Sequence, residues 1–336
     1  MTADVEPWKV PHEVSIVIPV YGGERTLPGL LAEIEPLTDI TPTPDGYLFR
    51  VVEVLLVYDN GNDDSPHVMR EAAERYDWVR PIWLSRNFGQ HAATLAGMAS
   101  SGGEWIVTLD EDGQHDPADI GVLLDAAMRT RSGVVYAKPV NKPSHGFLRN
   151  TASRGAKWLL TRLSADSNAP DYQSYRLILG SLGRGLAAYS GAGVYLDVAL
   201  GWVAPKPATA PIRLRDEGER RSGYTARRLF SHFWRLVITS GTRGLRLVSF
   251  LGFVFGVVGL VIALYILIAR LTGTDVPEGW ASTIVVMLLG SGAILVSLGI
   301  IAEYIGVSVN MSLGKPPYLI TADPEMGPLG RRRPGP

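Results

Sequence analysis

Residues 1–140 alternate between short apolar stretches and stretches with helical periodicity, and this alternation constrains the fold more than any other feature. The apolar stretches are typical of buried parallel strands. We predict five strands, at 14–20, 51–57, 81–84, 105–108 and 134–137. Helices are predicted between and after them, at 27–34, 65–76, 90–100 and 117–129. This order predicts an α/β fold with a doubly wound, mostly parallel sheet.

Polar residues follow the predicted strands at their carboxyl ends. Tyr21 follows the first strand, Asp59 the second, Arg86 the third and the acidic stretch 110–114 the fourth. Ligands of doubly wound sheets bind beyond these ends. We therefore expect these residues to converge on one binding site.

The acidic stretch has the pattern of a site for a hard metal ion. In extended chain, residues two apart point to the same side, so Asp110, Asp112 and Gln114 can present oxygen atoms together. Oxygen ligands on such a short span suit Mg²⁺ or Mn²⁺. An Asp-x-Asp pattern also occurs in solvated surface turns, which is the alternative interpretation.

The net charge of −1 hides a strongly basic block at 212–246. This block holds three acids, Asp216, Glu217 and Glu219, against nine arginines, which gives a net charge of +6. A basic block beside a membrane segment usually meets anionic headgroups or phosphates. Nucleic acid is the weaker interpretation, because the block leads directly into an apolar run. The chain has no cysteine, which excludes disulfides and thiolate metal sites.

Two uncharged apolar runs, 247–269 and 279–302, follow the basic block. Each exceeds the roughly 20 residues that a helix needs to cross a bilayer. Basic residues lie before the first run and after the second, so we predict that both termini are cytoplasmic. The polar segment 1–11 lacks the apolar core of a signal peptide. These features predict a multi-pass protein of the cell (inner) membrane.

Four arginines are candidates for binding a lipid phosphate. Arg149 and Arg154 lie in a basic amphipathic stretch at 147–163, which is either a membrane-surface helix or an ordinary core-facing helix. Arg220 and Arg221 belong to the basic block and form either a membrane-facing patch or a phosphate clamp.

Four motifs carry a resemblance that covers about residues 14–320. They are Ile18-Pro19-Val20-Tyr21, Leu84-Ser85-Arg86-Asn87-Phe88-Gly89, Leu109-Asp110-Glu111-Asp112-Gly113-Gln114-His115 and Glu303-Tyr304-Ile305-Gly306. With them the chain resembles the family 2 glycosyltransferases of the GT-A fold. The resemblance is strongest to the polyprenyl-phosphate branch, which includes dolichol-phosphate mannose synthase and the undecaprenyl-phosphate glycosyltransferases.

The resemblance implies a metal-dependent enzyme that transfers sugar, with inversion, from a nucleotide-sugar donor to polyprenyl phosphate on the cytoplasmic face. It implies that Pro19, Tyr21 and Asp59 line the nucleotide base pocket. Asp110 would lie near the ribose and the metal, and Asp112 and Gln114 would bind the metal. Arg176 would lie near the diphosphate or the acceptor phosphate, which makes Asp112 and Arg176 the catalytic candidates. Related enzymes often self-associate, so a homo-oligomer is a further expectation.

The sequence departs from the family pattern at four motifs, one of which is a Gly-Arg pair after the second apolar run that is replaced by Gly306-Val307. An Asn-Glu pair is replaced by Gly22-Gly23, which leaves Glu24 as the candidate for the base contact. Asp-Asp-Gly-Ser is replaced by residues 58–61 and Gly-Asp-Phe-Arg by residues 173–176. These departures keep open a non-catalytic, membrane-anchored nucleotide-sugar-binding or scaffold protein. A processive polysaccharide synthase is disfavoured, because Leu177 follows Arg176 and two spans are too few for a polymer channel.

Two further groups are expected to be structural. His91 and His115 are expected to be hydrogen-bonded or surface residues rather than metal ligands. The glycines at 180–185 are expected in turns, because no strand is evident before them. The predicted organisation is an N-terminal tail (1–11), a cytoplasmic GT-A domain (12–210), a basic juxtamembrane segment (211–246), a two-helix transmembrane hairpin (247–308) and a cytoplasmic tail (309–336) whose part after 320 is disordered.

Overall fold

The computed structural model describes residues 10–141, 173–191, 195–204, 206–215 and 279–326, with scattered positions between 252 and 272. The predicted amphipathic helix at 147–163 lies outside the described residues, as does most of the basic block. All four candidates for the lipid phosphate, Arg149, Arg154, Arg220 and Arg221, lie outside them as well.

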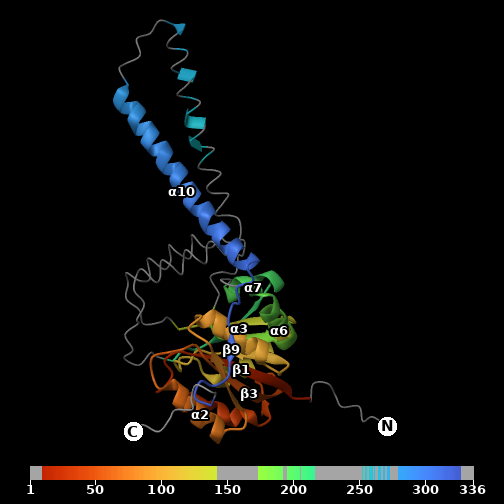
Figure 1. The fold of residues 1–336 in the computed structure, drawn as a ribbon. Helices are drawn as coiled ribbons and strands as arrows, with labels where there is room; N and C mark the ends of the chain where they lie inside the picture. The colour runs from red at the N-terminus through yellow and green to blue at the C-terminus, as the bar shows by residue number, and fades with distance from the viewer. Residues whose placement is uncertain are drawn as a thin grey trace, which may run out of the picture.

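A single mixed sheet forms the centre of the described part of the chain (Figure 1). Its strands are β1 His12–Val20, β2 Thr41–Pro42, β3 Leu48–Tyr58, β4 Val79–Leu84, β5 Trp105–Thr108, β6 Val134–Pro139, β7 Arg176–Leu179, β8 Ala208–Ile212 and β9 Ile320–Thr321. The order across the sheet is β8-β6-β7-β5-β1-β3-β4-β9, and β2 pairs with β3.

Neighbouring strands run parallel in four pairs and antiparallel in the other four, so the described sheet is mixed. The pairs β5–β1, β1–β3, β3–β4 and β6–β8 are parallel. β7 lies antiparallel between β5 and β6, and β2 and β9 are antiparallel to their partners. The prediction of an α/β fold is confirmed, but the expectation of a mostly parallel sheet was wrong, because β2, β7 and β9, which were not predicted, add four antiparallel pairs. The strand β8 was not predicted either.

Helices cover both faces of the sheet. The helices α1 Leu27–Ile34, α2 Ser65–Arg75 and α4 Ile120–Thr130 pack on one face, and α3 Gln90–Ser100, α6 Gly180–Tyr189 and α7 Leu196–Val203 pack on the other. Successive side chains of a strand point to opposite faces. Accordingly, Ile16 and Ile18 of β1 enter the core under α1, and Val17 enters the core under α3.

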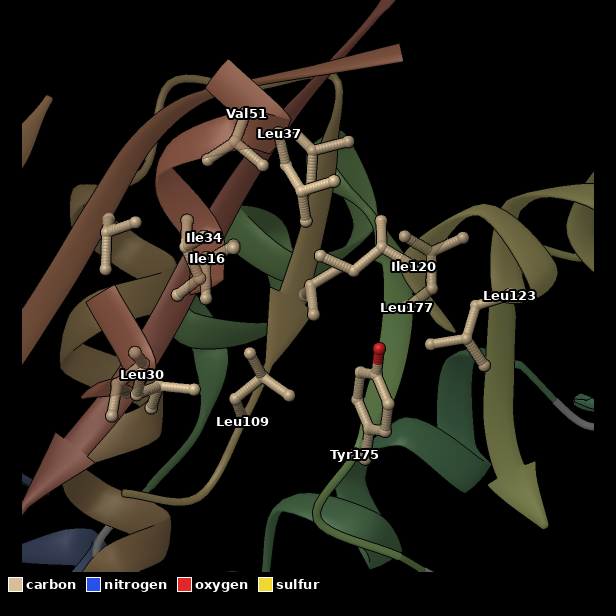
Figure 2. Close-up of a cluster of buried hydrophobic side chains, with 14 of the residues drawn as sticks. Ile16, Leu30, Ile34, Leu37, Val51, Leu109, Ile120, Leu123, Tyr175 and Leu177 are labelled. Carbon is tan, nitrogen blue, oxygen red and sulfur yellow. The ribbon is translucent and has the colours of Figure 1, made fainter. Parts of the chain in front are cut away.

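Figure 2 shows the core between the sheet and the helices α1 and α4. Leu30 and Ile34 of α1 point toward Ile16 of β1, and Ile120 and Leu123 of α4 lie near β7. All five side chains are at most 3% exposed. This packing holds the strands, and the loops that follow them, in fixed positions.

The glycines at 180–185 lie in helix α6 and not in turns. The strand β7 directly precedes them, so the prediction that they form turns was wrong. A Cβ atom at Gly180 would lie 2.4 Å from the carbonyl oxygen of Gly103, and one at Gly183 would lie 2.8 Å from Cδ1 of Ile106. The small residues therefore allow α6 to pack closely on β5 and the loop before it.

The second predicted apolar run forms most of α10 Trp280–Ser312, a long helix that projects from the sheet domain (Figure 1). Exposed apolar side chains on α10 include Ile294, Leu295 and Val296, which are 61%, 69% and 63% exposed. Within the described residues, no helix is both long and apolar enough to cross a membrane.

The chain after α10 returns to the sheet. β9 pairs with the edge strand β4, and the amide of Ser85 donates to the carbonyl of Leu319 (3.0 Å). Arg70 of α2 forms a bidentate pair with Asp323, with both N–O distances 2.7 Å. The expectation of disorder after residue 320 was therefore wrong for the described residues up to 326.

We predict that the Arg70–Asp323 pair contributes measurably to stability. The two side chains are 20% and 13% exposed, and bidentate charged hydrogen bonds with limited solvent screening are the stronger kind. A double-mutant cycle with Arg70→Ala and Asp323→Ala should give a coupling of about 1–2 kcal/mol in the free energy of unfolding.

The Arg50–Glu13 pair is the matched control, because its side chains are 45% and 42% exposed. The same cycle there should give less than about 0.5 kcal/mol. Equal coupling energies for the two pairs would show that the Asp323 contact does not hold the C-terminal segment.

Candidate active site

Four loops meet at one edge of the sheet, because β5, β1, β3 and β4 are neighbours that run in the same direction. These loops begin near Tyr21, Asp59, Arg86 and Asp110. The predicted convergence of polar residues at the carboxyl ends of the strands is therefore confirmed for these four positions.

Asp59 organises the start of helix α3. Its two carboxylate oxygens accept hydrogen bonds from the backbone amides of Phe88 (2.7 Å) and Gly89 (2.8 Å). The residue is 3% exposed, and burial raises the pKa of its carboxyl group, while the two amide hydrogen bonds oppose this rise. In the structure this carboxylate holds the loop of residues 85–89, and its predicted contact with a nucleotide base stays a prediction.

The remaining residues predicted to bind the nucleotide lie in or near the loops that follow β1 and β4. Arg86 is exposed, and its guanidinium carbon lies 4.0 Å from the centre of the Phe88 ring. Tyr21 is 48% exposed at the end of β1, and Pro19 is partly buried within that strand. Glu24 is exposed and accepts a hydrogen bond from the amide of Asp64 (3.3 Å) at the start of α2.

Asp110 is held by two donors from different elements. Gln90 Nε2 at the start of α3 donates to its Oδ1 atom, and the Ser174 hydroxyl before β7 donates to its Oδ2 atom. Both donor–acceptor distances are 2.5 Å. Desolvation raises the pKa of Asp110, and the hydrogen bond from Ser174 opposes that rise. Ser174 is one of the departures from the family pattern, and here it supplies a hydrogen bond to the acidic stretch.

Asp112 and Gln114 lie on the turn that follows. The amide of Gln114 donates to Oδ1 of Asp112 (3.0 Å), and Gly113 between them has a φ of +73°, which favours glycine. Together with Asp110 they place side-chain oxygens within five residues, which is the donor chemistry that Mg²⁺ or Mn²⁺ prefers. The described residues contain no group of three His, Cys, Asp or Glu side chains that could hold a metal. A metal there would thus rely on the amide oxygen of Gln114, on water or on a ligand.

Glu111 is a structural contact that the sequence analysis missed. Its carboxylate accepts hydrogen bonds from the amides of Tyr21 (3.0 Å) and Gly22 (2.9 Å), which joins the loop after β5 to the loop after β1. A Cβ atom at Gly23 would lie 2.7 Å from Oε2 of Glu111. Gly23 thus leaves room for this carboxylate. A signal was present, because a third acid stands between the two predicted ligands.

Arg176 is buried beneath the acidic stretch. It is 4% exposed, forms a short ion pair with Asp197, and donates from Nε to the Thr108 hydroxyl (3.0 Å). Its predicted contact with a phosphate stays a prediction, and the structure directs the guanidinium to Asp197. The hydroxyl of Tyr136 also donates to Asp197 (3.2 Å).

The two histidines have aromatic neighbours. The ring centre of His91 lies 4.5 Å from that of Tyr195, and the ring centre of His115 lies 5.0 Å from that of Tyr175. His115 is 7% exposed, and burial lowers its pKa. Its Nδ1 atom has no hydrogen-bond partner among the described residues, so the expected hydrogen bond is absent at that atom.

Comparison with protein families places this site in a known group. Residues 15–183, half of the chain, match the model of Glycosyl transferase family 2. The chain therefore belongs to this family, and the resemblance drawn from its motifs is confirmed. The matched range contains most of β1, the strands β2 to β7 and every loop of the candidate site.

Curated relatives are similar over almost the whole chain. An undecaprenyl-phosphate 4-deoxy-4-formamido-L-arabinose transferase of Edwardsiella ictaluri is 28% identical and covers 91% of this chain and 93% of its own length. The protein of the same name from Klebsiella pneumoniae is 29% identical, with 92% of each chain covered.

Solved structures with weaker similarity include a glucosyl-3-phosphoglycerate synthase from Mycobacterium tuberculosis in complex with Mn²⁺, uridine diphosphate and glucosyl-3-phosphoglycerate. It is 16% identical with a TM-score of 0.47, and the match covers 69% of this chain and 80% of that one. S. aureus TarS 1–349 in complex with UDP-GlcNAc is 14% identical with a TM-score of 0.47, covering 68% and 66%.

We predict that Gly61→Ala disrupts the site. A Cβ atom at Gly61 would lie 1.6 Å from the carbonyl oxygen of Tyr21, so the loops after β1 and β3 would have to separate. The free energy of unfolding should fall by about 3 kcal/mol, as measured by thermal or denaturant unfolding.

Gly29→Ala is the matched control on α1, where a Cβ atom would have no neighbour within 4 Å. Alanine is the better helix former, so this variant should be more stable by roughly 0.5 kcal/mol. Similar stability of the two variants would contradict the close approach of Gly61 to Tyr21.

Proposed function

We propose that this protein is a glycosyltransferase that transfers a sugar, with inversion, from a nucleotide-sugar donor to polyprenyl phosphate, giving a polyprenyl-phosphate sugar. The observation that carries the proposal is the meeting of Tyr21, Asp59 and the acidic stretch at one edge of the sheet in a member of Glycosyl transferase family 2. The names of the curated relatives, which are similar over more than nine-tenths of the chain, support a polyprenyl-phosphate acceptor.

The loops after β1, β3 and β4 would hold the nucleotide. Asp59 fixes the loop before α3 through two backbone amides, and Glu111 fixes the loop at Tyr21 and Gly22. Both contacts are made between groups of the protein itself, and such contacts reduce the cost of ordering these loops on binding. Exposed Tyr21 and Arg86 then remain available at the rim of the site.

The acidic stretch would hold the donor diphosphate through a divalent cation, Mg²⁺ or Mn²⁺, bound by Asp110, Asp112 and Gln114. Such a cation would neutralise the diphosphate and favour its departure. The acceptor phosphate needs no strong general base, because a phosphate monoester has a second pKa of about 6 and is largely ionised at pH 7. This accords with a site in which the described histidines pack against aromatic rings.

We further propose that the protein is a multi-pass protein of the cell membrane with its sheet domain and both termini on the cytoplasmic side. Support comes from the two uncharged apolar runs in the sequence and from the arginines that precede them. The exposed apolar side chains of α10 also support contact with lipid. A membrane location would bring the site to an acceptor that is itself a lipid.

We predict that Asp112→Asn removes most of the activity. The variant loses a negative charge at the proposed metal, so release of nucleoside diphosphate in the presence of donor, polyprenyl phosphate and Mn²⁺ should fall about 100-fold or more. The assay would use the full-length protein in detergent or nanodiscs, with a panel of nucleotide sugars.

Asp77→Asn is the matched control, an exposed aspartate just before β4, at the opposite end of that strand from the site. It should leave turnover unchanged. Near-normal turnover by Asp112→Asn would refute the metal role of Asp112. Nucleotide binding without transfer, for every donor in the panel, would instead support a non-catalytic binding or scaffold protein.

We also predict that removal of divalent cations stops turnover. EDTA in excess should abolish acceptor-dependent release of nucleoside diphosphate, and an excess of Mg²⁺ or Mn²⁺ over EDTA should restore it. Full activity in EDTA would contradict a metal at Asp110, Asp112 and Gln114.

A further inference from the structure

Arg215 lies beyond β8 and contacts two other parts of the sheet domain. Its Nη1 atom donates to both carboxylate oxygens of Glu33 on α1 (2.9 and 2.7 Å), and its Nη2 atom lies 2.8 Å from Oδ2 of Asp116. Its backbone amide donates to the carbonyl of Gln114 (3.0 Å). One residue thus contacts α1, Gln114 at the end of the acidic stretch and Asp116 just after it.

The segment that carries Arg215 is itself fixed. The amide of Leu214 donates to Oδ1 of Asn141 (3.0 Å), and Nδ2 of Asn141 donates to the carbonyl of Leu214 (2.7 Å). The amide of Val140 donates to the carbonyl of Ile212. Arg215 is therefore presented to the acidic stretch from an ordered extension of the sheet, past the domain boundary predicted at residue 210.

The acidic stretch has separate supports at its two ends. Upstream, Gln90 and Ser174 hold Asp110, and Leu109 continues the pairing with β1. Downstream, Asp116 caps the short helix η3 Pro117–Asp119. The carbonyl of Asp116 accepts a hydrogen bond from the hydroxyl of Tyr175 (3.0 Å). Arg215 adds an ion pair at Asp116 and a backbone contact at Gln114.

We propose that Arg215 is a positioning residue for the metal-binding turn. By fixing Asp116 and the backbone of Gln114, it holds the side chains of Asp112 and Gln114 in the arrangement that receives a divalent cation. Residues that orient metal ligands typically change metal affinity or activity about 10–100-fold when they are removed. The metal role rests on the proposed function, whereas the contacts of Arg215 are features of the structure.

The test is the affinity of the full-length protein for Mn²⁺ alone, measured from the loss of the free Mn²⁺ signal in electron paramagnetic resonance. Arg215→Ala should raise the Kd for Mn²⁺ about tenfold or more. Arg215→Lys keeps the charge and the backbone amide but has no guanidinium to bridge two carboxylates, so it should restore part of the affinity.

Arg50→Ala is the matched control, since it removes another exposed Arg–Glu pair. This pair joins Arg50 of β3 to Glu13 of β1, near the amino ends of both strands. Its Kd should equal that of the unaltered protein. An unchanged Kd in folded Arg215→Ala, even with a lower melting temperature, would overturn the proposal, as would an equal loss in Arg50→Ala. An unaltered protein that fails to bind Mn²⁺ would overturn it as well.

If Arg215→Ala does not fold, Glu33→Gln tests the proposal instead. This variant weakens the ion pair between Glu33 of α1 and Arg215 and leaves Arg215 in place. A Kd raised about threefold would support the proposal, and an unchanged Kd would overturn it. Failure of the proposed function is distinguishable. Mn²⁺ binding that depends on Arg215, without sugar transfer to any acceptor, would refute the transferase alone.

Discussion

The parallel strands β5, β1, β3 and β4 end at one edge of the sheet, and the backbone amides of the loops beyond them need hydrogen-bond acceptors. Carboxylates supply these acceptors. Asp59 accepts hydrogen bonds from two backbone amides before α3, and Glu111 accepts hydrogen bonds from two backbone amides after β1. The acids at this edge therefore build the loops as well as offering charge to a ligand.

This arrangement separates two kinds of acid. Asp59 and Glu111 have their oxygens turned to the protein, whereas Asp112 bonds to the amide of Gln114 within its own turn. Asp110 lies between these cases, because Gln90 and Ser174 each donate to one of its oxygens. An oxygen of a carboxylate can accept more than one bond, so these contacts orient Asp110 and Asp112 without using all their lone pairs. Acids oriented in this way suit a divalent cation and a diphosphate.

Much of the fold could be predicted from the sequence, because the five predicted strands have strong local signals. β7 could not, since it has four residues and its place between β5 and β6 depends on contacts distant in the chain. β9 was missed for the same reason, as two residues after a long helix carry no strand signal. Long-range pairing rather than local propensity decides both strands.

The candidate site was predicted in position but not in all its contacts. Alternation along an extended chain grouped Asp110, Asp112 and Gln114 as metal ligands, which stays a prediction. It left Glu111 without a role, although Glu111 reaches the loop after β1. Arg176 was assigned to a phosphate by resemblance, and its partner Asp197 lies on α7, which periodicity alone did not place next to β7. Contacts between elements distant in the sequence are visible only once the sheet order is known.

The most direct test of a divalent cation at the acidic stretch is a crystal structure of the protein with Mn²⁺ and a nucleoside diphosphate bound, with anomalous diffraction recorded at the manganese absorption edge. We predict one strong anomalous peak within coordination distance of Asp112 and Gln114, with the diphosphate on the same ion and the base beside Tyr21. A peak elsewhere, or a diphosphate bound away from the ends of β1, β3 and β5, would contradict it.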